Sequence, residues 1–457
     1  MPQVDACRKA WFDVFAWQPA LTDTAGKPGI TFRVRLNWRR VEPVWGSTEH
    51  LTNGERVAWY RRRRGLSQEV LAGLVGRTGD WLSKVENGHI PLDRLSVLRR
   101  LADALGVSLG DLIGEPSVAC DATDGDTTPM SALRALLMDY RPLTPILSGP
   151  DLDAEPSSLA ELEHELQLVF DAYQASRFSI AASRLPLLLM DTILAARNCD
   201  HDKRCRAHEL LALTYQATAA VLTKLGDSGL ALVAAERGLT AAQSGGECAV
   251  VGSLIRAVAF ALLSAGRNEP ARQLSEAGAS YLRPYLVNGD GNLWSVYGTL
   301  FLVASMAAAR SGDRASTAGC LHEAEVAAQR LRGDGNHLWT AFGPTNVKIH
   351  RINTAMELGD VQIALDLGPG LDTSAVPIER RVRHLLDVAR AYNASGRQDS
   401  AFGTVLAAER LAPDQIANHY VSRRLVCTWI RHGHGEPHIE LVRLADRMGI
   451  ARTSRRG

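Results

Sequence analysis

A short motif that recurs through the last two-thirds of this 457-residue chain limits the folds that it can adopt. Each copy has a small residue, usually glycine, then a polar residue, and an alanine five places after the first. Successive copies lie 37 to 50 residues apart, in sequence with a helical pattern. Small residues at a tight turn let two antiparallel helices approach closely, and stacked helix pairs form a solenoid. We therefore predict an all-α chain whose residues 158–457 form an α-solenoid.

The copies keep the motif to different degrees. The complete copies are Gly226-Asp227 with Ala231, Gly266-Arg267 with Ala271, Gly359-Asp360 with Ala364, and Gly396-Arg397 with Ala401. The two weaker copies are Ser176-Arg177 with Ala181, and Gly312-Asp313 with its alanine displaced to Ala315 and Ala318. Pro186 lies in the second helix of the first pair and predicts a kink or a late helix start, because proline lacks the N–H group.

The repeats resemble tetratricopeptide repeats in their junctions and their spacing. They are longer and more irregular than the usual repeat of about 34 residues, and most copies lack the aromatic signature of that family. The resemblance covers residues 158 to about 450 and implies stacked antiparallel helix pairs.

Three further segments precede the repeats. Residues 1–50 lack a sustained period, so we expect a poorly structured N-terminal extension, and we hypothesise that it is not part of the working protein. Residues 51–114 predict five short helices at about 54–64, 67–75, 78–86, 93–105 and 108–113, with Ser67, Thr78 and Ser108 as N-caps. Residues 115–157 are rich in Pro, Gly, Asp, Ser and Thr and predict a linker with one helical piece at 130–139.

Residues 68–87, QEVLAGLVGRTGDWLSKVEN, have the spacing of a helix-turn-helix. Ala72 is small where two helices must cross, and Gly76 stands where the backbone must turn. Four apolar residues fall where they would seal the helices together: Leu71, Val75, Leu82 and Val85. Several constraints met at fixed offsets make this a specific signal for a DNA-binding unit.

The segment from Gly54 to about Leu112 resembles the repressor-type helix-turn-helix family, known as the Cro/C1 or xenobiotic-response-element class. The resemblance rests on RRRRGLSQ (61–68), LA (71–72), LSKVENG (82–88) and LADALGVSL (101–109). It implies that Arg61 pairs with Glu86 and locks the first helix onto the end of the recognition helix. It also implies a base-reading face made of Thr78, Gly79, Asp80, Ser83 and Lys84.

The side chains of this face suit base edges, because Lys84 can donate to guanine, Asp80 can accept from cytosine and Thr78 can contact a thymine methyl. Two departures leave the bases undetermined: Gly79 has no side chain, and Arg77 occupies a position that is often apolar in the family. The resemblance implies phosphate contacts by Gln68, Asn87 and Arg94, and from the arginine run we expect further phosphate contacts by Arg62, Arg63 and Arg64.

Charge distribution supports this interpretation. The whole chain has a net charge of only +1, but residues 56–100 carry ten Arg or Lys against four acidic residues. The alternative is that the five helices form an interaction domain that does not bind DNA, with the arginine run as a solvated face. The complete motif beside a local excess of six positive charges favours double-stranded DNA as the partner.

A second candidate site lies in WTAFGPTNVKIHRINT, residues 339–354. Asn346, His350 and Asn353 recur at helical spacing and would project from one face. In a repeat array the first helices line a concave groove, where Asn amides can bind a peptide backbone and Trp339 and Phe342 could supply apolar pockets. The alternative is an ordinary polar outer face.

Other chemistry is not indicated. We find no nucleophile motif, phosphate-binding glycine loop or paired carboxylates, so an enzyme is disfavoured. The cluster Cys199, His201, Cys205 and His208 matches no familiar zinc spacing, so we expect neither a metal nor another cofactor. Seven scattered cysteines and the lack of an 18-residue apolar run favour a cytoplasmic, nucleoid-associated protein without a membrane partner.

The sequence thus predicts a sequence-specific, DNA-binding transcriptional regulator. The repeat domain would form a homodimer and sense a peptide, protein or small-molecule effector, an arrangement similar to that of peptide-responsive quorum-sensing regulators. A dimer would place two recognition helices about one DNA turn apart, which predicts an inverted-repeat operator. The alternatives are a repeat-based interaction scaffold whose small domain docks protein, and a regulator without any effector.

Overall fold

The computed structural model describes residues 52–64, 66–90, 92, 94–105, 107, 112, 128–139, 157–432 and 439–450. Within these ranges the regular secondary structure is α-helix with two short 3₁₀ helices, and the all-α prediction is confirmed. The predicted extension at 1–50 and most of the predicted linker at 115–157 lie outside the described residues.

The small domain begins at a capping box in which Thr52 and Glu55 satisfy each other's backbone N–H groups. Four helices follow: α2 (Asn53–Arg63), α3 (Gln68–Leu74), α4 (Gly79–Glu86) and α5 (Leu95–Leu105). Ser67 and Thr78 act as N-caps, accepting the N–H groups of Val70 and Trp81. The predicted fifth helix falls mostly outside the described residues, but Leu112 within it is fully buried in the core that these helices share.

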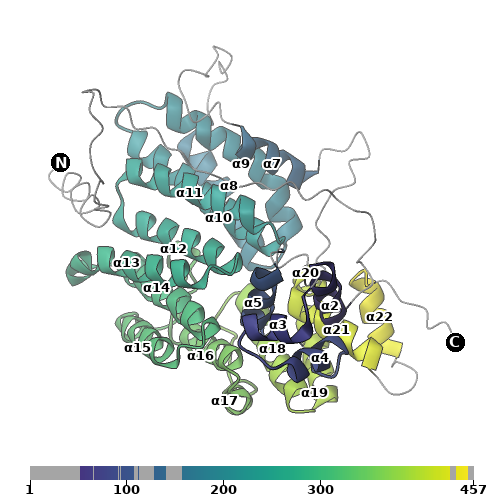
Figure 1. The fold of residues 1–457 in the computed structure, drawn as a ribbon. Coiled ribbons are helices and arrows are strands. Elements are labelled where there is room, and N and C mark those ends of the chain that lie inside the picture. The colour runs from purple at the N-terminus through teal and green to yellow at the C-terminus, as the bar shows by residue number, and fades with distance from the viewer. Residues whose placement is uncertain are drawn as a thin grey trace, which may run out of the picture. The chain divides into compact units, whose positions relative to one another are not determined.

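The repeats form six helix pairs within the described residues (Figure 1). The pairs are α8 (Leu159–Gln174) with α9 (Phe178–Asn198), α10 (Arg204–Lys224) with α11 (Ser228–Gly245), α12 (Cys248–Ser264) with α13 (Asn268–Leu282), α14 (Gly291–Arg310) with α15 (Arg314–Arg330), α16 (Pro344–Leu358) with α17 (Val361–Leu367), and α18 (Ile378–Ala394) with α19 (Gln398–Leu411). The first helix of each pair contacts the first helix of the next, and α18 also contacts α8.

Shorter elements complete the described chain. The 3₁₀ helices are η3 (Arg283–Asn288) and η4 (His337–Trp339), and three helices follow the pairs: α20 (Pro413–Asn418), α21 (Tyr420–His432) and α22 (Ile439–Arg447). The helix expected at 130–139 is α7 (Pro129–Met138), which packs on α9 and α11 through buried leucines.

Each repeat junction has the same backbone geometry, which explains the motif. The first residue of every copy has a positive φ, at Gly226, Gly266, Gly312, Gly359 and Gly396, and at Ser176 with φ 60°. Glycine tolerates this left-handed conformation without steric cost, and it ends the first helix of the pair. The alanine of the motif is fully buried in five copies, at Ala181, Ala231, Ala271, Ala364 and Ala401.

Two predictions about the repeats are wrong. Ala315 and Ala318 are exposed, and the buried position five places after Gly312 is filled by Thr317, whose hydroxyl donates to the Asp313 carbonyl at 2.6 Å. A hydroxyl satisfied by its own helix can therefore replace the alanine. For Pro186 only the late helix start is wrong, because α9 begins at Phe178 and continues through the proline; the alternative, a kink at Pro186, stays a prediction.

Two described helices, α9 and α14, are long and apolar enough to cross a membrane when judged by length and composition alone. In their most apolar stretches, 50% and 78% of the residues are buried inside the protein. Packing in the repeat core accounts for this composition, so it is weak evidence for a membrane helix.

Candidate DNA-binding site and effector pocket

The turn between α3 and α4 has the geometry that the sequence predicts. Gly76 has φ 68°, and the N–H of Arg77 donates to the carbonyl of Ala72 at 2.8 Å, which closes the end of α3. Leu71, Ala72 and Leu82 are fully buried between the helices. The backbone and core of this segment are therefore those of a helix-turn-helix.

A buried ion pair holds α2 to the end of α4. Arg61 donates from Nε and Nη2 to the two carboxylate oxygens of Glu86, at 2.6 and 2.7 Å. The side chains are only 10% and 4% exposed, and Arg61 also donates to the Leu66 carbonyl at 2.9 Å. The hydrogen bond to Glu86 raises the pKa of Arg61 above its ordinary value. This is the pairing that the family resemblance implied.

Gln68, an expected phosphate contact, joins the same network by donating to Glu86 at 2.8 Å. Its amide nitrogen carries a second hydrogen that can reach a phosphate at the start of α3. The other expected contacts Arg62, Arg64, Asn87 and Arg94 are exposed, and the side chain of Arg63 lies outside the described residues. The described members therefore offer several donors to a DNA backbone.

The expected base-reading residues lie on or beside the start of α4. Thr78, Asp80 and Lys84 are exposed, and Lys84 forms an ion pair with Asp80 at 2.8 Å. Ser83 is half-buried, and its carbonyl accepts the side-chain amide of Asn87 at 2.9 Å. The face is open, but two of its charges are paired with each other.

Gly79 and Arg77 have local structural reasons. A Cβ at Gly79 would lie 3.1 Å from Glu69 Cγ, so the absence of a side chain lets α4 begin close against α3. The Arg77 guanidinium lies 5.5 Å from the centre of the Trp81 ring. A cation over an aromatic face explains why an arginine is tolerated where the family often has an apolar residue.

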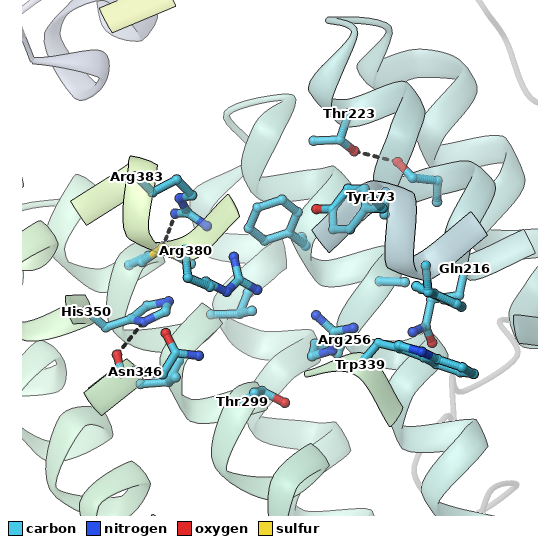
Figure 2. Close-up of a pocket in the computed structure, with 18 residues that line it drawn as sticks. Tyr173, Gln216, Thr223, Arg256, Thr299, Trp339, Asn346, His350, Arg380 and Arg383 are labelled. Carbon is cyan, nitrogen blue, oxygen red and sulfur yellow. Dashed lines mark hydrogen bonds between the residues drawn. The ribbon is translucent and has the colours of Figure 1, made fainter. Parts of the chain in front are cut away.

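The repeats line a partly open cavity of about 60 Å³, shown in Figure 2. Its lining comes from the first helix of every pair, from α8 to α18, and from η4. Aromatic side chains Phe170, Tyr173 and Trp339 line it together with Arg256, Arg380 and Arg383. A concave surface built from first helices is therefore present, and it combines apolar walls with charge.

The segment before α16 closes one part of this cavity. Trp339 stacks on Phe170 with ring centres 4.0 Å apart, and Gln174 donates to the Trp339 carbonyl at 3.3 Å. Leu338, Trp339 and Ala341 all have positive φ, between 46° and 54°. This conformation is costly for residues with a Cβ and is retained where surrounding contacts demand it.

Three of the five residues predicted for an effector groove line the cavity: Trp339, Asn346 and His350. Asn346 and His350 are only 1% and 5% exposed, so an ordinary polar outer face is wrong for them. The Asn346 amide donates to the Ala341 carbonyl, and the His350 Nδ1–H donates to the Asn346 carbonyl, both at 2.9 Å. Burial lowers the pKa of His350 to about 3, with nearby Arg383 and Arg380 adding to the shift, so the ring is neutral.

The other two residues of this group serve the fold. Phe342 is fully buried, and its ring packs where a Cβ on Gly298 would have to stand. Asn353 turns toward α18 and donates to Asp387 at 2.9 Å. Sequence spacing placed these residues near the groove but did not distinguish its wall from the core behind it.

Sequence reasoning missed the charges of the cavity, which are Arg256, Arg380 and Arg383. A signal was available at Arg256, because it is the only charged residue in the apolar helix α12. Arg380 and Arg383 lie three residues apart on α18 and so share one helix face. Their meeting with Arg256 depends on how the repeats stack, which no local pattern reveals.

One acidic side chain serves several of these cations. Glu379 is 2% exposed and accepts hydrogen bonds from Lys224 and, at 2.9 Å, from Arg380. Burial acts to raise the pKa of Glu379, but Arg380, Lys224 and Arg383 outweigh it and hold that pKa below its ordinary value. Burial also lowers the pKa of Lys224 to about 8.

Comparisons with known proteins agree with the first site. Residues 54–113 match the family model of a helix-turn-helix domain, so the helix-turn-helix prediction is confirmed. No curated protein matches the sequence. Among solved structures, the chain is similar to PlcR of Bacillus thuringiensis in complex with the peptide PapR7 and DNA. The identity is 11%, the alignment covers 78% of this chain and 99% of that chain, and the TM-score is 0.34.

Proposed function

We propose that this chain is a sequence-specific DNA-binding transcriptional regulator, whose repeat domain forms a homodimer and senses an effector. The observation that carries the proposal is the exposed start of α4, a helix whose end is held by the buried Arg61–Glu86 pair, within a segment that matches a helix-turn-helix model. A recognition helix held at a fixed angle, with open polar residues at its N-terminal end, suits the major groove.

The residues that read the bases would be Thr78, Asp80, Ser83 and Lys84. Gly79, which has no side chain, would let the backbone of α4 approach the DNA closely. The ion pair between Lys84 and Asp80 would have to open or rotate on binding, which releases one donor and one acceptor for base edges. Arg62, Arg63, Arg64, Gln68, Asn87 and Arg94 would bind phosphates and set the register. Such a regulator would act in the cytoplasm, at the nucleoid.

Effector sensing is supported by the cavity that the first helices line. Trp339 faces it from a segment whose backbone is held in costly conformations, and Asn346 and His350 line it from the helix α16 that follows. A ligand bound between α8 and α18 would contact several repeats at once, so its binding could favour one arrangement of the array over another.

Selection of bound DNA from a random pool by the purified full-length protein tests the proposal. We expect enrichment of an inverted repeat with half-sites about 10 bp or a multiple apart, and affinity that falls steeply with salt. Lys84→Ala should weaken binding to the selected site by about tenfold or more. The matched control Lys348→Ala, an exposed lysine on α16, should bind like the wild type.

Two results would overturn the proposal. One is a pool that shows no sequence enrichment, which would favour a protein-interaction scaffold instead. The other is equal loss of binding in Lys84→Ala and Lys348→Ala, because that pattern would mean that only total charge matters.

A further inference from the structure

The cavity of the repeats holds more positive charge than its own carboxylates balance. Arg256 reaches it from α12, while Arg380 and Arg383 reach it from α18, as Figure 2 shows. Arg380 shares Glu379 with Lys224. Within the described ranges, neither Arg256 nor Arg383 forms an ion pair.

A second acid that attracts Arg383, Asp387, is already hydrogen-bonded to other side chains. Asp387 attracts Arg383 electrostatically, but its oxygens accept hydrogen bonds from Arg390 at 3.0 Å and from Asn353 at 2.9 Å. Arg383 instead contacts the Met306 sulfur at 3.8 Å. Burial, together with repulsion by Arg380, lowers the pKa of Arg256 to about 10. Guanidinium groups held together in this way are costly for the empty protein.

Unpartnered polar atoms give a second, independent sign. Among the described residues, Arg256 Nε, Arg380 Nε and Asn346 Oδ1 are buried without a hydrogen-bond partner. Asn346 is 1% exposed and lines the same cavity, with its amide nitrogen already bonded to Ala341. Buried donors and acceptors are normally satisfied, so this set lacks two acceptors and one donor that a ligand could supply.

We propose that the cavity binds a small organic acid, whose carboxylate or phosphate group pairs with Arg256, Arg380 and Arg383. Arg guanidinium groups bind both anions through paired N–H donors. Asn346 Oδ1 accepts a hydroxyl or amide hydrogen of the same ligand, and the Phe170–Trp339 stack packs against its apolar part. The cavity volume of about 60 Å³ suits a compact acid. This inference names the effector class and so rests on the effector sensing proposed above.

The neutral His350 distinguishes this cavity from a patch of basic residues that are all charged. Its pKa of about 3 means that it adds no charge near neutral pH and can serve as a hydrogen-bonding wall. The site therefore selects acids by a fixed set of arginines, and binding should not depend on this histidine titrating between pH 6 and 8.

Calorimetric titration of the full-length protein tests the inference with three probes: inorganic phosphate, acetate and the hydroxy acid glycolate, at constant ionic strength. We expect saturable binding of phosphate or of the carboxylates, with glycolate tighter than acetate because Asn346 accepts its hydroxyl. The tighter of the two anion types identifies the acidic group. Arg256→Met should weaken binding by about tenfold or more, since a charged hydrogen bond is lost.

Thermal denaturation keeps the result interpretable. Because Arg256→Met removes an unbalanced buried charge, the variant should melt at or above the wild-type temperature without ligand, so weak binding is not a sign of unfolding. The matched control Arg410→Met, an exposed arginine on α19, should bind the probes like the wild type.

Three outcomes would overturn the inference: none of the probes binds, Arg256→Met binds as tightly as the wild type, or Arg410→Met loses as much affinity as Arg256→Met. Selection of DNA from the random pool does not use the cavity. A selection without sequence enrichment would therefore refute the proposed regulator function and leave the proposed acid binding intact. Loss of acid binding would likewise leave the DNA-binding proposal intact.

Discussion

Breaking the Arg61–Glu86 pair should loosen the small domain more than any exposed arginine change in the same helix. Arg61→Met leaves the Glu86 carboxylate, 4% exposed, with Gln68 as its remaining side-chain donor. Removing one partner of a buried pair costs about 3 kcal/mol or more. That loss corresponds to a roughly 150-fold larger population of locally opened molecules.

Hydrogen exchange read by mass spectrometry on the full-length protein measures this opening in peptides from α4 (Gly79–Glu86). We expect α4 amides to exchange roughly 100-fold faster in Arg61→Met, and repeat peptides to be unchanged. Arg62→Met, an exposed neighbour in α2, is the matched control and should exchange like the wild type.

A double variant distinguishes charge from packing. Arg61→Met/Glu86→Leu removes both charges and should recover most of the lost stability, to within about 1 kcal/mol of the wild type. The reasoning would be refuted by unchanged α4 exchange in Arg61→Met. It would also be refuted if the double variant lost the sum of the two single losses, since the pair would then contribute only through its packing.

Two further predictions concern the repeats. Gly298→Ala should lower the free energy of unfolding by about 1–3 kcal/mol, because the new methyl overlaps the buried Phe342 ring. Gly319→Ala on α15, where a Cβ meets nothing within 4 Å, should raise the free energy of unfolding by about 0.5–1 kcal/mol. Thermal denaturation of both variants checks this prediction, and equal shifts of the melting temperature would contradict it. Burial lowers the pKa of His350 in the folded protein to about 3, whereas its pKa in the unfolded chain is about 6.5. Between pH 6.5 and pH 3 the unfolded chain therefore binds a proton at this ring that the folded protein does not bind. The free energy of unfolding falls by up to about 1.4 kcal/mol for each pH unit below 6.5. Urea unfolding at pH 7, 5 and 4 should show a smaller acid loss in His350→Gln than in the wild type, and equal losses would mean that the ring is not held neutral.

The features that were predictable from sequence are those in which the local backbone conformation favours one residue type. Gly76 turns the helix-turn-helix with φ 68°, and the junction glycines end each first helix in the same left-handed region. Ser176 adopts that conformation without being glycine, which is why its copy looked weak.

The features that were not predictable depend on tertiary contacts. Thr317 replaces the expected alanine because its hydroxyl is satisfied within its own helix, and Phe342 is core because it fills the space above Gly298. Arg256 and Arg383 lie in helices α12 and α18, far apart in sequence, and only the stacking of the repeats brings them to one cavity. A motif search cannot identify such a site from either residue alone.

The hydrogen bond between Ser176 and Gln415 limits how this array can evolve. At the first junction the hydroxyl of Ser176, a residue only 2% exposed, donates to Gln415 Oε1 on α20 at 2.6 Å. An open solenoid can gain or lose a unit at little cost, since each repeat contacts only its neighbours. Here an inserted or deleted helix pair would shift α20 away from Ser176 and break the contact of α18 with α8. The number of helix pairs in this domain is therefore fixed, and adaptation to a new effector would proceed by substitution of residues that line the cavity.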